Sequence, residues 1–389
     1  MKVLLFTLEY PPFKGGVANY YEGLVKNWPS FTKNATDGKP EIFVLNNNKN
    51  KLIKKWLIPK WLFAFWHLYR TVKKEKIDHI IVGHILPLGT VVYLLNKFKK
   101  INYSVVFHGM DFTYTLNKKR KKKITKKILD RAENIICANN YTAGLVKNFL
   151  KEQKKVYVVN PGIDINIEFN KEKSNYLRKK YNLEDKIVLF SIGRLVKRKG
   201  FDTVLEVLSE AQKAVPNLFY IIAGDGPDKV YLKEKARGVN NVIFLGRIED
   251  SDKFDWLAAC DIFIMPSREI RLATTILQSG GQANGDHKND DLATGDFEGF
   301  GIVYLEASLA QKPIIAGDTG GVKDAVKSGY SGILVDPKNK KRLAEVIIGF
   351  SQNEKLREDL GRQGRKRAIN EFNWKRQVEK FYNIINKNI

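Results

Sequence analysis

Short apolar runs alternate with amphipathic segments along the whole chain. In the first half the strand-like runs lie at 2–8, 41–45, 79–82, 103–107, 133–138 and 156–159. The second half repeats the pattern with runs at 187–192, 218–223, 242–245, 262–265, 313–316 and 332–335. Between them, apolar residues recur at helical spacing, as in 201–214. Strands that alternate with helices, twice over, predict an α/β protein with two Rossmann-like, doubly wound parallel-sheet domains and a cleft between them.

The boundary between the two domains is predicted from a cluster of helix and strand breakers. Asn160-Pro161-Gly162-Ile163-Asp164 lies near the middle of the chain. We therefore expect an N-terminal domain over 1–163 and a C-terminal domain over 164–373. A last helix begins near Asn373 and carries an apolar stripe that needs a docking surface. The simplest expectation from the pattern alone is that this helix packs on the second domain.

One segment, 268–297, interrupts the alternation of strands and helices. The part from Gln278 to Asp296 contains Gly, Asn and Asp but no aromatic residue, which is typical of an inserted surface loop. Two interpretations stay open. The segment is either a neutral insertion or a lid over the cleft.

Composition narrows the class of protein. With 389 residues, of which 43% are hydrophobic, the chain can fold into about two ordinary domains and is not disordered as a whole. No run approaches the length of about 20 apolar residues that a membrane span needs. The first residues lead directly into a strand-like run without a signal-peptide pattern. Cys137 and Cys260 each lie in an apolar segment and are interpreted as small buried side chains in a reducing compartment, so we expect a cytoplasmic protein.

The formal net charge of +25 favours contact with polyanions. No zinc-finger spacing or RNP-like aromatic motif is present, so no specific nucleic-acid partner is expected. The segment 51–76 is basic and aromatic, and Trp56, Trp61 and Trp66 recur every five residues, so they do not share one helical face. It is either an amphipathic helix packed on the sheet or a helix at a membrane surface. The lysine run at 117–127 is either a solvated helix face or loop, or a contact for an anionic membrane.

The stretch 296–307 holds the strongest candidate chemistry. Glu298 and Glu306 are separated by seven residues, and a Gly-Phe-Gly loop between them leads into a predicted helix. Such a loop presents backbone N–H groups and the positive end of a helix dipole, which suits a phosphate or another anion. The two carboxylates could hold a sugar hydroxyl and a ribose hydroxyl. The alternative is that both are solvated helix residues.

Other candidate residues follow predicted strands. Gly15-Gly16 is either a tight turn or a loop that approaches a ligand, and the glycines do not match G-x-G-x-x-G. His108, followed by Gly109 and Asp111, stands at the carboxyl end of a buried strand, where open α/β sheets place their ligands. Asp250-Ser251-Asp252 has the spelling of a metal motif, but it stands at a helix start, where Asp and Ser are expected to cap N–H groups.

The order of the motifs resembles one enzyme family. PPFKGGVANY, FHGMDF, NPGID, SIGRLVKRKG, AGDGP, EGFGIVYLE and GDTGGVKDAV follow one another over nearly the whole chain. The chain is similar to the retaining glycosyltransferases of family 4, which have the GT-B fold. GRLVKRKG followed by EGFGIVYLE is the most specific part. The resemblance implies two Rossmann-like domains facing a central cleft, with the C-terminal helix 374–389 packed on the first domain.

The resemblance assigns donor-side roles in the second half. It implies that Arg194 and Lys199 clamp the diphosphate of a nucleotide sugar, where two cations would stabilise the leaving nucleotide. It also implies that Glu306 binds the ribose and that Glu298 contacts the donor sugar. The donor-binding set is completed by the loop Gly299, Phe300 and Gly301, and by Gly246 and Arg247 near the base.

The resemblance also assigns roles in the first half. His108 would face the transferred sugar and, with Glu298, Arg194 and Lys199, form the catalytic set. Gly16 would lie close to the diphosphate. Gly15 and Asp111 would lie on the acceptor side, although Asp111 could serve only to fix its loop.

The implied reaction is hexosyl transfer from a UDP- or GDP-linked sugar to an acceptor hydroxyl, with retention and without metal or cofactor. The implied acceptor is a glycan or a lipid-linked glycan of the cell envelope, which would place the protein at the inner face of the membrane as a peripheral protein. A non-catalytic binder of sugar nucleotides or polyanions is the alternative. The insertion at 268–297 departs from the family pattern and bears on donor-site closure and acceptor choice.

Overall fold

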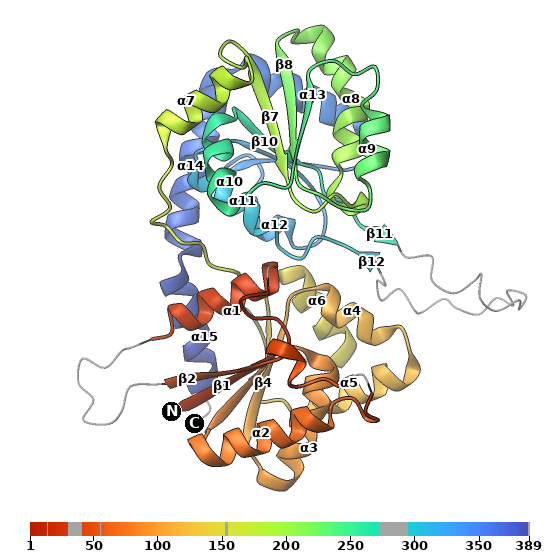
Figure 1. Ribbon diagram of the computed structural model, residues 1–389, viewed down its shortest axis with the longest axis vertical. Helices are drawn as coiled ribbons and strands as arrows, with labels where there is room; N and C mark the ends of the chain where they lie inside the picture. Colours follow the sequence, from red (N-terminus) through yellow and green to blue (C-terminus); the bar gives the residue numbers. More distant parts are fainter. Residues whose placement is uncertain (14, 30–40, 55, 152–154, 272–294, 388–389) are drawn as a thin grey trace, which may run out of the picture. The chain divides into compact units, whose positions relative to one another are not determined.

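The computed structural model describes residues 1–13, 15–29, 41–54, 56–151, 155–271 and 295–387 (Figure 1). The chain divides into two units of similar architecture. Unit 1 comprises Met1–Gly162, Arg271–Gly299 and Trp374–Ile389, and unit 2 comprises Ile163–Ile270 and Phe300–Asn373. Most of the insertion predicted at 268–297, and with it the question of a lid, lies outside the described residues.

Unit 1 contains a six-stranded sheet in the order β2-β1-β3-β4-β5-β6, and its paired strands are parallel. Its strands are β1 (Lys2–Thr7), β2 (Glu41–Asn46), β3 (His79–Val82), β4 (Asn102–Phe107), β5 (Asn134–Cys137) and β6 (Val156–Val158). Its helices are α1 (Gly16–Lys26), α2 (Leu62–Glu75), α3 (Thr90–Lys99), α4 (Met110–Leu116), α5 (Lys119–Arg131), α6 (Asn140–Leu150) and α15 (Trp374–Asn386), with the short turns η1 (Asn48–Asn50) and η2 (Ile85–Gly89).

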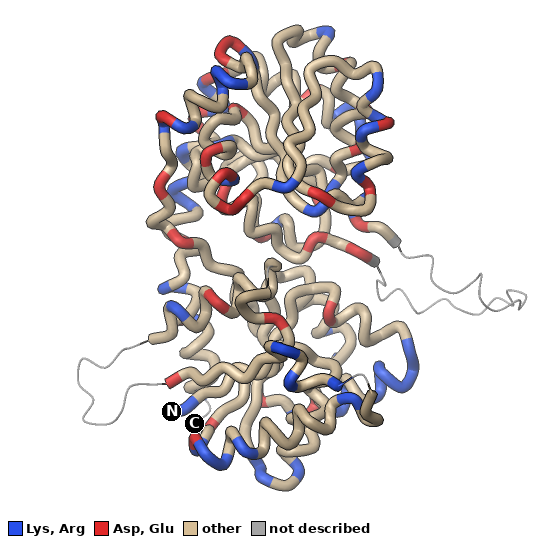
Figure 2. Tube along the Cα trace, viewed as in Figure 1, with Lys and Arg blue, Asp and Glu red and all other residues tan. Residues whose placement is uncertain are grey.

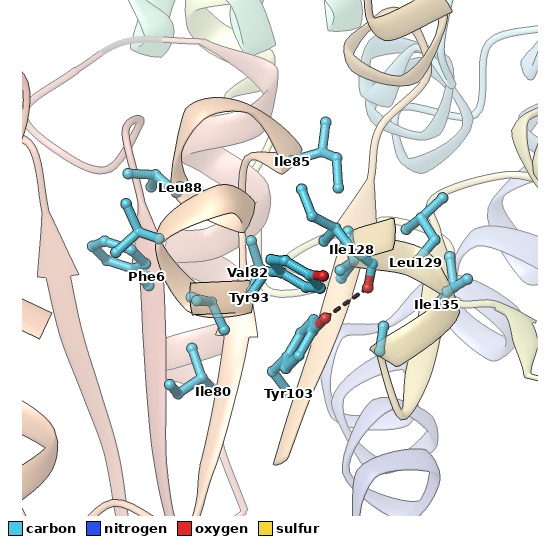
Figure 3. Packing of buried hydrophobic residues seen from close by; sticks show 14 of the residues in the cluster. Phe6, Ile80, Val82, Ile85, Leu88, Tyr93, Tyr103, Ile128, Leu129 and Ile135 are labelled. Atoms are coloured by element: carbon cyan, nitrogen blue, oxygen red, sulfur yellow. Dashed lines mark hydrogen bonds between the residues drawn. The ribbon is translucent and has the colours of Figure 1, made fainter. Parts of the chain in front are cut away.

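Apolar side chains cover both faces of this sheet, which explains why its strands are nearly continuous apolar runs. On one face, Phe6, Ile80 and Val82 pack with residues of α3 and α5 (Figure 3). The hydroxyl of Tyr103 donates a 2.6 Å hydrogen bond to the carbonyl oxygen of Ile128 in that layer. Fully burying side chains of this size stabilises the fold by about 1.5–3 kcal/mol each.

The opposite face of the unit 1 sheet is covered by α1 and α15. Val378, Phe381 and Ile385 of α15 are buried against residues of β1 and α1. A Cβ atom on Gly23 of α1 would overlap the indole ring of Trp374, so glycine is needed for this close approach. The apolar stripe of the last helix therefore packs within unit 1 and not on the second domain, the surface that the pattern alone favoured.

Unit 2 contains a second six-stranded sheet, in the order β14-β13-β10-β7-β8-β9, and its pairs are also parallel. Its strands are β7 (Ile187–Ile192), β8 (Leu218–Ala223), β9 (Val242–Gly246), β10 (Ile262–Met265), β13 (Ile314–Gly317) and β14 (Gly332–Val335). Its helices are α7 (Lys171–Lys180), α8 (Phe201–Ala214), α9 (Lys229–Lys235), α10 (Asp250–Ala259), α11 (Ile302–Leu309), α12 (Val322–Ala325), α13 (Lys340–Gln352) and α14 (Glu354–Phe372), with the turn η3 (Lys197–Lys199). The expected fold class, two Rossmann-like parallel-sheet units, is confirmed.

Both sheets have a topological switch point, where the direction of strand addition reverses. In unit 1 the chain goes from β1 to β2 on one side and then crosses to β3, so the switch point lies between β1 and β3. In unit 2 the strands β7, β8 and β9 follow outward, and the chain then returns to β10 beside β7. Ligands of open α/β sheets bind beyond the carboxyl ends of the strands at these points.

The segment before α11 belongs to unit 1 by its contacts, although the sequence predicted one uninterrupted domain over 164–373. Gly299 packs so closely on the backbone of His108 that a Cβ would lie 2.5 Å from the His108 carbonyl oxygen. Phe297 stacks edge-on against Tyr141 of α6, with ring centroids 4.9 Å apart. A short pair of strands, β11 (Ile270–Arg271) and β12 (Gly295–Asp296), precedes this segment.

Candidate functional site

The switch point of unit 2 gathers the loop after β7, the end of β10 and the helix α11. The Arg268 N–H donates to the carbonyl oxygen of Arg198, which joins the segment after β10 to the loop after β7. The Tyr304 hydroxyl of α11 donates to the carbonyl oxygen of Met265 at 2.8 Å. The loop GRLVKRKG and the helix of EGFGIVYLE, which the sequence predicted to act together, are therefore linked through the end of β10.

Two cations lie on the loop after β7, in different environments. Arg194 is exposed, whereas Lys199 is buried and its Nζ atom lies 3.9 Å from the place where a Cβ of Gly193 would be. Gly200 ends the turn with a φ of +76°, and a Cβ there would overlap the carbonyl oxygen of Pro266. The backbone thus holds the Lys199 ammonium beside the loop, while the Arg194 guanidinium remains available to an anion from solvent.

A bidentate ion pair supports this loop from behind. The guanidinium of Arg268 donates to both carboxylate oxygens of Asp202, at 2.9 and 2.7 Å, and to the hydroxyl of Thr203 at 2.6 Å. Asp202 and Thr203 lie in the first turn of α8. The start of α8 is therefore fixed to the end of β10, the neighbour of β7 in the sheet.

The helix α11 begins after Gly301, which has a φ of +79°. Its first N–H groups and its dipole give this end a partial positive charge. Glu306, one turn further, is buried and accepts a 2.6 Å hydrogen bond from the ammonium of Lys253 on α10. The ammonium thus holds one carboxylate oxygen of Glu306, and a carboxylate accepts hydrogen bonds from hydroxyl groups such as those of a ribose.

The ends of β8 and β9 complete this edge of unit 2. Gly246 has a φ of +72°, and its carbonyl oxygen accepts a 2.6 Å hydrogen bond from the Gly224 N–H. Arg247, which follows it, is exposed. The pKa of the exposed Asp225 is lowered, chiefly by the hydrogen bond from Lys229, with the Gly226 N–H and the charge of Arg247 adding to it.

The motif Asp250-Ser251-Asp252 does not cap α10 as expected. Glu249 occupies the N-cap position, and Asp250 and Asp252 lie inside the first turn. There the two carboxylates interact with the helix dipole instead of accepting a capping hydrogen bond. Among the residues that the structure describes, no group of three or more His, Cys, Asp or Glu side chains is placed to hold a metal ion.

In unit 1, His108 follows β4 and is enclosed by two tyrosines of α1. The rings of Tyr20 and Tyr21 meet the imidazole edge-on, with centroids 4.8 and 5.1 Å away. The Tyr21 hydroxyl donates to the carbonyl oxygen of Gly83 at 2.9 Å and lies 2.9 Å from Nε2 of His108. Because its single hydrogen goes to Gly83, this hydroxyl accepts from His108, so Nε2 carries the proton and Nδ1 the lone pair. Burial, with a smaller contribution from His84, lowers the pKa of His108 to about 3, and the imidazole is neutral at physiological pH.

Asp111 holds the loop that carries His108. Its carboxylate accepts hydrogen bonds from the N–H groups of His108, Gly109 and Phe112 at 2.8 to 3.1 Å. Burial raises the pKa of Asp111, and these backbone donors act in the opposite direction. The geometry is that of a residue that fixes its loop, which was one of the two roles expected for it.

The segment with Glu298 lies against the same loop. Gly109 has a φ of +138°, and a Cβ there would lie 3.2 Å from the ring of Phe297. Glu298 itself is buried. The structure therefore brings Glu298 and Gly299 together with the His108 loop, whereas Phe300, Gly301 and Glu306 are residues of unit 2.

Gly15 and Gly16 lie at the start of α1. Gly15 is the N-cap residue, and a Cβ on Gly16 would meet no atom of the described residues within 4 Å. As far as the described part of unit 1 extends, the space beside Gly16 is open. A Cβ on Gly15 would lie 4.0 Å from a carboxylate oxygen of Glu9.

Glu9 and His84 form a pair at the switch point of unit 1 that sequence reasoning missed. The Leu8 N–H donates to Nδ1 of His84 at 3.2 Å, so Nε2 carries the proton, and Nε2 lies 3.5 Å from a carboxylate oxygen of Glu9. Each is the second residue after a central strand, β1 or β3, and this position was a usable signal. Tyr21 and Lys253 were also missed, because nothing in a helical sequence pattern distinguishes them from packing or solvated residues.

The described part of the chain contains no helix both long and apolar enough to cross a bilayer. The segment 51–76 includes the helix α2, which packs on the sheet through Ala64 and Leu68. The lysine run at 117–127 falls largely on α5, so its interpretation as a helix face holds for most of its length.

Two family models match the chain. Residues 173–367 match the family model described as glycosyl transferases group 1, and residues 31–167 match the model described as glycosyltransferase family 4. A GDP-mannose-dependent monoacylated alpha-(1-6)-phosphatidylinositol monomannoside mannosyltransferase of Corynebacterium glutamicum is 25% identical over 99% of this chain and 97% of its own. An uncharacterized glycosyltransferase of Methanocaldococcus jannaschii is 28% identical over 97% of this chain and 96% of its own.

Solved structures support the fold. The crystal structure of Anabaena Alr3699/HepE in complex with UDP superposes with a TM-score of 0.75 at 18% identity, covering 100% of both chains. The match extends over both sheets and the C-terminal helix. Family models that together cover most of the chain, relatives of full length and this shared architecture lead to one conclusion: the chain belongs to the glycosyl transferases group 1 family and is a glycosyltransferase of the GT-B fold.

Proposed function

We propose that this glycosyltransferase moves a hexosyl group from a nucleotide-diphosphate sugar to an acceptor hydroxyl, with retention of anomeric configuration. The observation that carries the proposal is the switch point of unit 2. Exposed Arg194, buried Lys199 and the positive end of α11 belong to one connected set of loops there. A diphosphate needs such an arrangement of fixed cations and backbone N–H groups.

The proposed donor is GDP-mannose or, as the second choice, a UDP-linked sugar. Two curated relatives are GDP-mannose-dependent mannosyltransferases, and one solved relative was crystallised with UDP. Arg194 and Lys199 would bind the diphosphate, Glu306 the ribose hydroxyls, and Gly246 with Arg247 the base. Phe300 and Gly301 would present N–H groups to the sugar and the phosphate. The pair between Glu306 and Lys253 supports the ribose role, since a carboxylate held by an ammonium keeps its second oxygen for a hydroxyl.

In unit 1 the proposed roles concern neutral, hydroxyl-bearing parts of the substrates. His108, uncharged and with its lone pair on Nδ1, would accept a hydrogen bond from a hydroxyl of the transferred sugar. Glu298 and Gly299, in the segment that packs against the His108 loop, would contact the donor sugar. Gly16 would allow close approach of the diphosphate, and Gly15 would lie on the acceptor side. Asp111 would act there only through the loop that it fixes.

We add Glu9 and His84 to the acceptor side. They lie at the switch point of unit 1, and Glu9 faces Gly15. Nε2–H of His84 orients the Glu9 carboxylate, which could then accept a hydrogen bond from the acceptor hydroxyl.

The retaining step would need no protein nucleophile. The acceptor hydroxyl would attack C1 from the face that the diphosphate leaves, through an oxocarbenium-like state, and a departing phosphate oxygen would take its proton. Arg194, Lys199 and the helix end would stabilise the negative charge that develops on the diphosphate. The step is proposed to proceed without metal or cofactor because these cations supply the charge that a metal would otherwise provide.

The proposed acceptor is a glycan or a lipid-linked glycan of the cell envelope. The Corynebacterium relative acts, by its description, on a phosphatidylinositol monomannoside, which is a lipid. A lipid acceptor would require the enzyme to work at a membrane surface. We therefore propose that the protein is cytoplasmic and associates peripherally with the inner face of the cell membrane.

A thermal-shift panel of UDP-, GDP- and ADP-sugars tests the donor. A ligand at 100 times its dissociation constant stabilises the folded state by about 2.7 kcal/mol, so the true donor should raise the Tm clearly. The product of the donor so identified is then analysed by NMR for its anomeric configuration, with and without EDTA. A stabilising sugar nucleotide without any transfer or hydrolysis would favour the non-catalytic alternative, and an inverted product or loss of activity in EDTA would contradict the mechanism.

A further inference from the structure

Unit 1 exposes a row of large apolar side chains on α2 and the loop before it. We call this surface the aromatic–basic face. It consists of Trp56, Ile58, Leu62, Trp66 and Tyr69 and of the bordering cations Lys54, Lys60, Arg70, Lys73 and Lys99. Trp56 is 73% exposed and Ile58 is 92% exposed, while Leu62, Trp66 and Tyr69 are partly exposed. Leu62, Trp66 and Tyr69 are spaced by four and three residues, so they share one side of the helix.

This face is not needed for the packing of unit 1. Ala64 and Leu68 lie on the other side of α2 and are fully buried in the core. Trp61, Phe65 and Val72 pack against the same core cluster. The helix thus has two apolar sides, and among the described residues one side is buried in the core while the other stays partly exposed. Large exposed apolar patches on a protein usually mark a binding surface.

Cations lie over two of the exposed rings and over the half-buried ring of Phe63. The guanidinium of Arg70 lies 4.5 Å from the ring centroid of Trp66, and Nζ of Lys99, from α3, lies 5.6 Å from that of Tyr69. Nζ of Lys54 lies 5.9 Å from the centroid of Phe63. Lys60 and Lys73 are also exposed. The only acid between residues 51 and 76 is Glu75, which pairs with Lys74 at 3.2 Å.

The basic character continues from α2 to α5 across α3. Nζ of Lys97 lies 5.0 Å, and the guanidinium of Arg131 lies 5.4 Å, from the ring centroid of Tyr93 on α3. The lysine-rich start of α5 is exposed. Figure 2 shows Lys and Arg on all three of these helices of unit 1. A positive potential extending over three helices attracts an extended anionic surface more strongly than it attracts a small ligand.

The mixture of side chains decides which partner fits. Trp and Tyr prefer the interface of a bilayer, Ile and Leu reach into the acyl region, and Lys and Arg meet anionic headgroups. A nucleic acid would use the rings for stacking and would leave Ile58 and Leu62 without a role. The cores of protein interfaces are depleted of lysine, which is abundant here. Charge and apolarity together therefore point to an anionic lipid surface.

We infer that the aromatic–basic face is a membrane-docking surface that inserts Trp56, Ile58, Leu62 and Trp66 into the interface of an anionic bilayer. The start of α5 supplies additional attraction to the headgroups. This inference rests on the membrane location given under the proposed function and assigns it to residues. It requires neither donor nor acceptor, so it can fail or stand independently of the transferase reaction.

The test is flotation of the full-length protein with vesicles, in the absence of any substrate. Vesicles of equimolar phosphatidylcholine and phosphatidylglycerol should carry the protein at low salt, and vesicles of pure phosphatidylcholine should not. The double variant Ile58→Ser/Trp66→Ser should bind at least about tenfold more weakly, because two anchors no longer enter the interface. The double variant Lys60→Ala/Lys73→Ala should bind about thirtyfold more weakly, since each lysine near an anionic surface contributes about a factor of five.

Matched control substitutions lie in unit 2. Tyr176 of α7 and Val230 of α9 are 62% and 68% exposed, and Nζ of Lys180 lies 5.8 Å from the Tyr176 ring centroid. Tyr176→Ser/Val230→Ser also removes one exposed aromatic and one exposed aliphatic side chain, and it should leave flotation unchanged. Circular dichroism of every variant checks that the fold is intact.

Four outcomes would overturn the inference: no flotation at low salt, equal flotation with pure phosphatidylcholine, equal weakening by the control pair, or unchanged binding by Ile58→Ser/Trp66→Ser. Tighter binding to poly(A) than to anionic vesicles, lost in the same variant, would identify the face as a nucleic-acid surface instead. If flotation behaves as expected but no sugar nucleotide stabilises the protein, the docking surface stands and the proposed reaction fails.

Discussion

The two units are built on the same sheet but use it for different chemistry. At the switch point of unit 2 the prominent groups are charged: Arg194, Lys199 and the pair Lys253–Glu306. At the corresponding edge of unit 1 the prominent groups are the neutral His108 and the tyrosines around it. All five histidines of the chain lie outside the ranges of unit 2.

This difference teaches how one architecture can be specialised. Stabilising a diphosphate requires positive charge and backbone N–H groups, and unit 2 supplies both from loops shaped by glycines. Recognising sugar hydroxyls requires oriented hydrogen-bonding groups but no concentration of positive charge, and unit 1 supplies such groups from side chains fixed by burial. The sheet itself contributes only the position of the switch point.

The largest effect is expected from removing charge at the proposed donor site. Lys199→Ala and Glu298→Ala should each lower kcat by about 10²–10³, because each would lose an interaction with charge that develops in the transition state. Lys197→Ala, an exposed lysine in the same turn, is the control and should keep full turnover. Steady-state kinetics with the identified donor measures the effect. Wild-type turnover by both site variants would remove the site assignment.

The buried histidines predict that acid destabilises unit 1 more than unit 2. Burial lowers the pKa of His79 to about 4 and that of His108 to about 3, both below the unfolded value near 6.5. Below pH 6.5 the unfolded chain binds protons that the folded chain excludes, so stability is constant above this pH and falls below it. At pH 5 each histidine should lower the free energy of unfolding by about 2 kcal/mol.

Hydrogen exchange followed by mass spectrometry measures this for each unit. Unit 1 should lose protection between pH 6.5 and 4, and unit 2 should change much less. His79→Gln should reduce the loss in unit 1 by about half, with the remainder due to His108. Equal losses in both units would contradict the assignment of the acid sensitivity to these imidazoles.

A glycine comparison tests whether the backbone shapes the charged loop of unit 2. Gly200 and Gly329 have nearly the same φ, +76° and +75°, but a Cβ on Gly329 would meet no described atom within 4 Å. Gly329→Ala should therefore cost only the backbone strain, about 1 kcal/mol. Gly200→Ala should cost about 2 kcal/mol more, because its Cβ overlaps the Pro266 carbonyl, and it should also weaken donor binding. Urea unfolding measures the free energy of unfolding of both variants. Similar losses of stability would show that the close approach of Gly200 to Pro266 has no energetic consequence.

The smallest effect is expected on the acceptor side of unit 1. Glu9→Gln should raise the KM for the acceptor by about five- to tenfold, since it removes one charge-assisted hydrogen bond. Glu22→Gln is a matched control: Glu22 is a glutamate of similar exposure on α1, paired with Lys26 at 2.8 Å. A change in donor KM instead of acceptor KM would move Glu9 to the donor side.

Much of the fold could be predicted from the sequence because parallel strands buried on both faces are continuous apolar runs. Every predicted strand from β1 to β14 in the two large sheets is present, with shifts of a residue or so at its ends. The helix α3 was not predicted, although Val91, Val92 and Leu95 are buried at helical spacing. It follows Pro87 and the irregular turn η2, so the point where the helical spacing of apolar residues begins cannot be recognised in the sequence. Trp56, Trp61 and Trp66 do not lie on one face of a helix. Their spacing therefore did not reveal that Leu62, Trp66 and Tyr69 lie together on one side of α2.

The sequence by itself determined the alternation of strands and helices, and from it came the predictions of a domain boundary near Gly162 and of the motif residues Arg194, Lys199, Glu298 and Glu306. Only the tertiary structure decided which groups are neighbours. It paired Glu306 with Lys253 and Glu9 with His84, enclosed His108 between two tyrosines, and packed the segment that carries Glu298 against the His108 loop. The physical reason is that strand order and burial, which local patterns do not encode, set the distances between residues far apart in the chain and thereby their charge and hydrogen-bond partners.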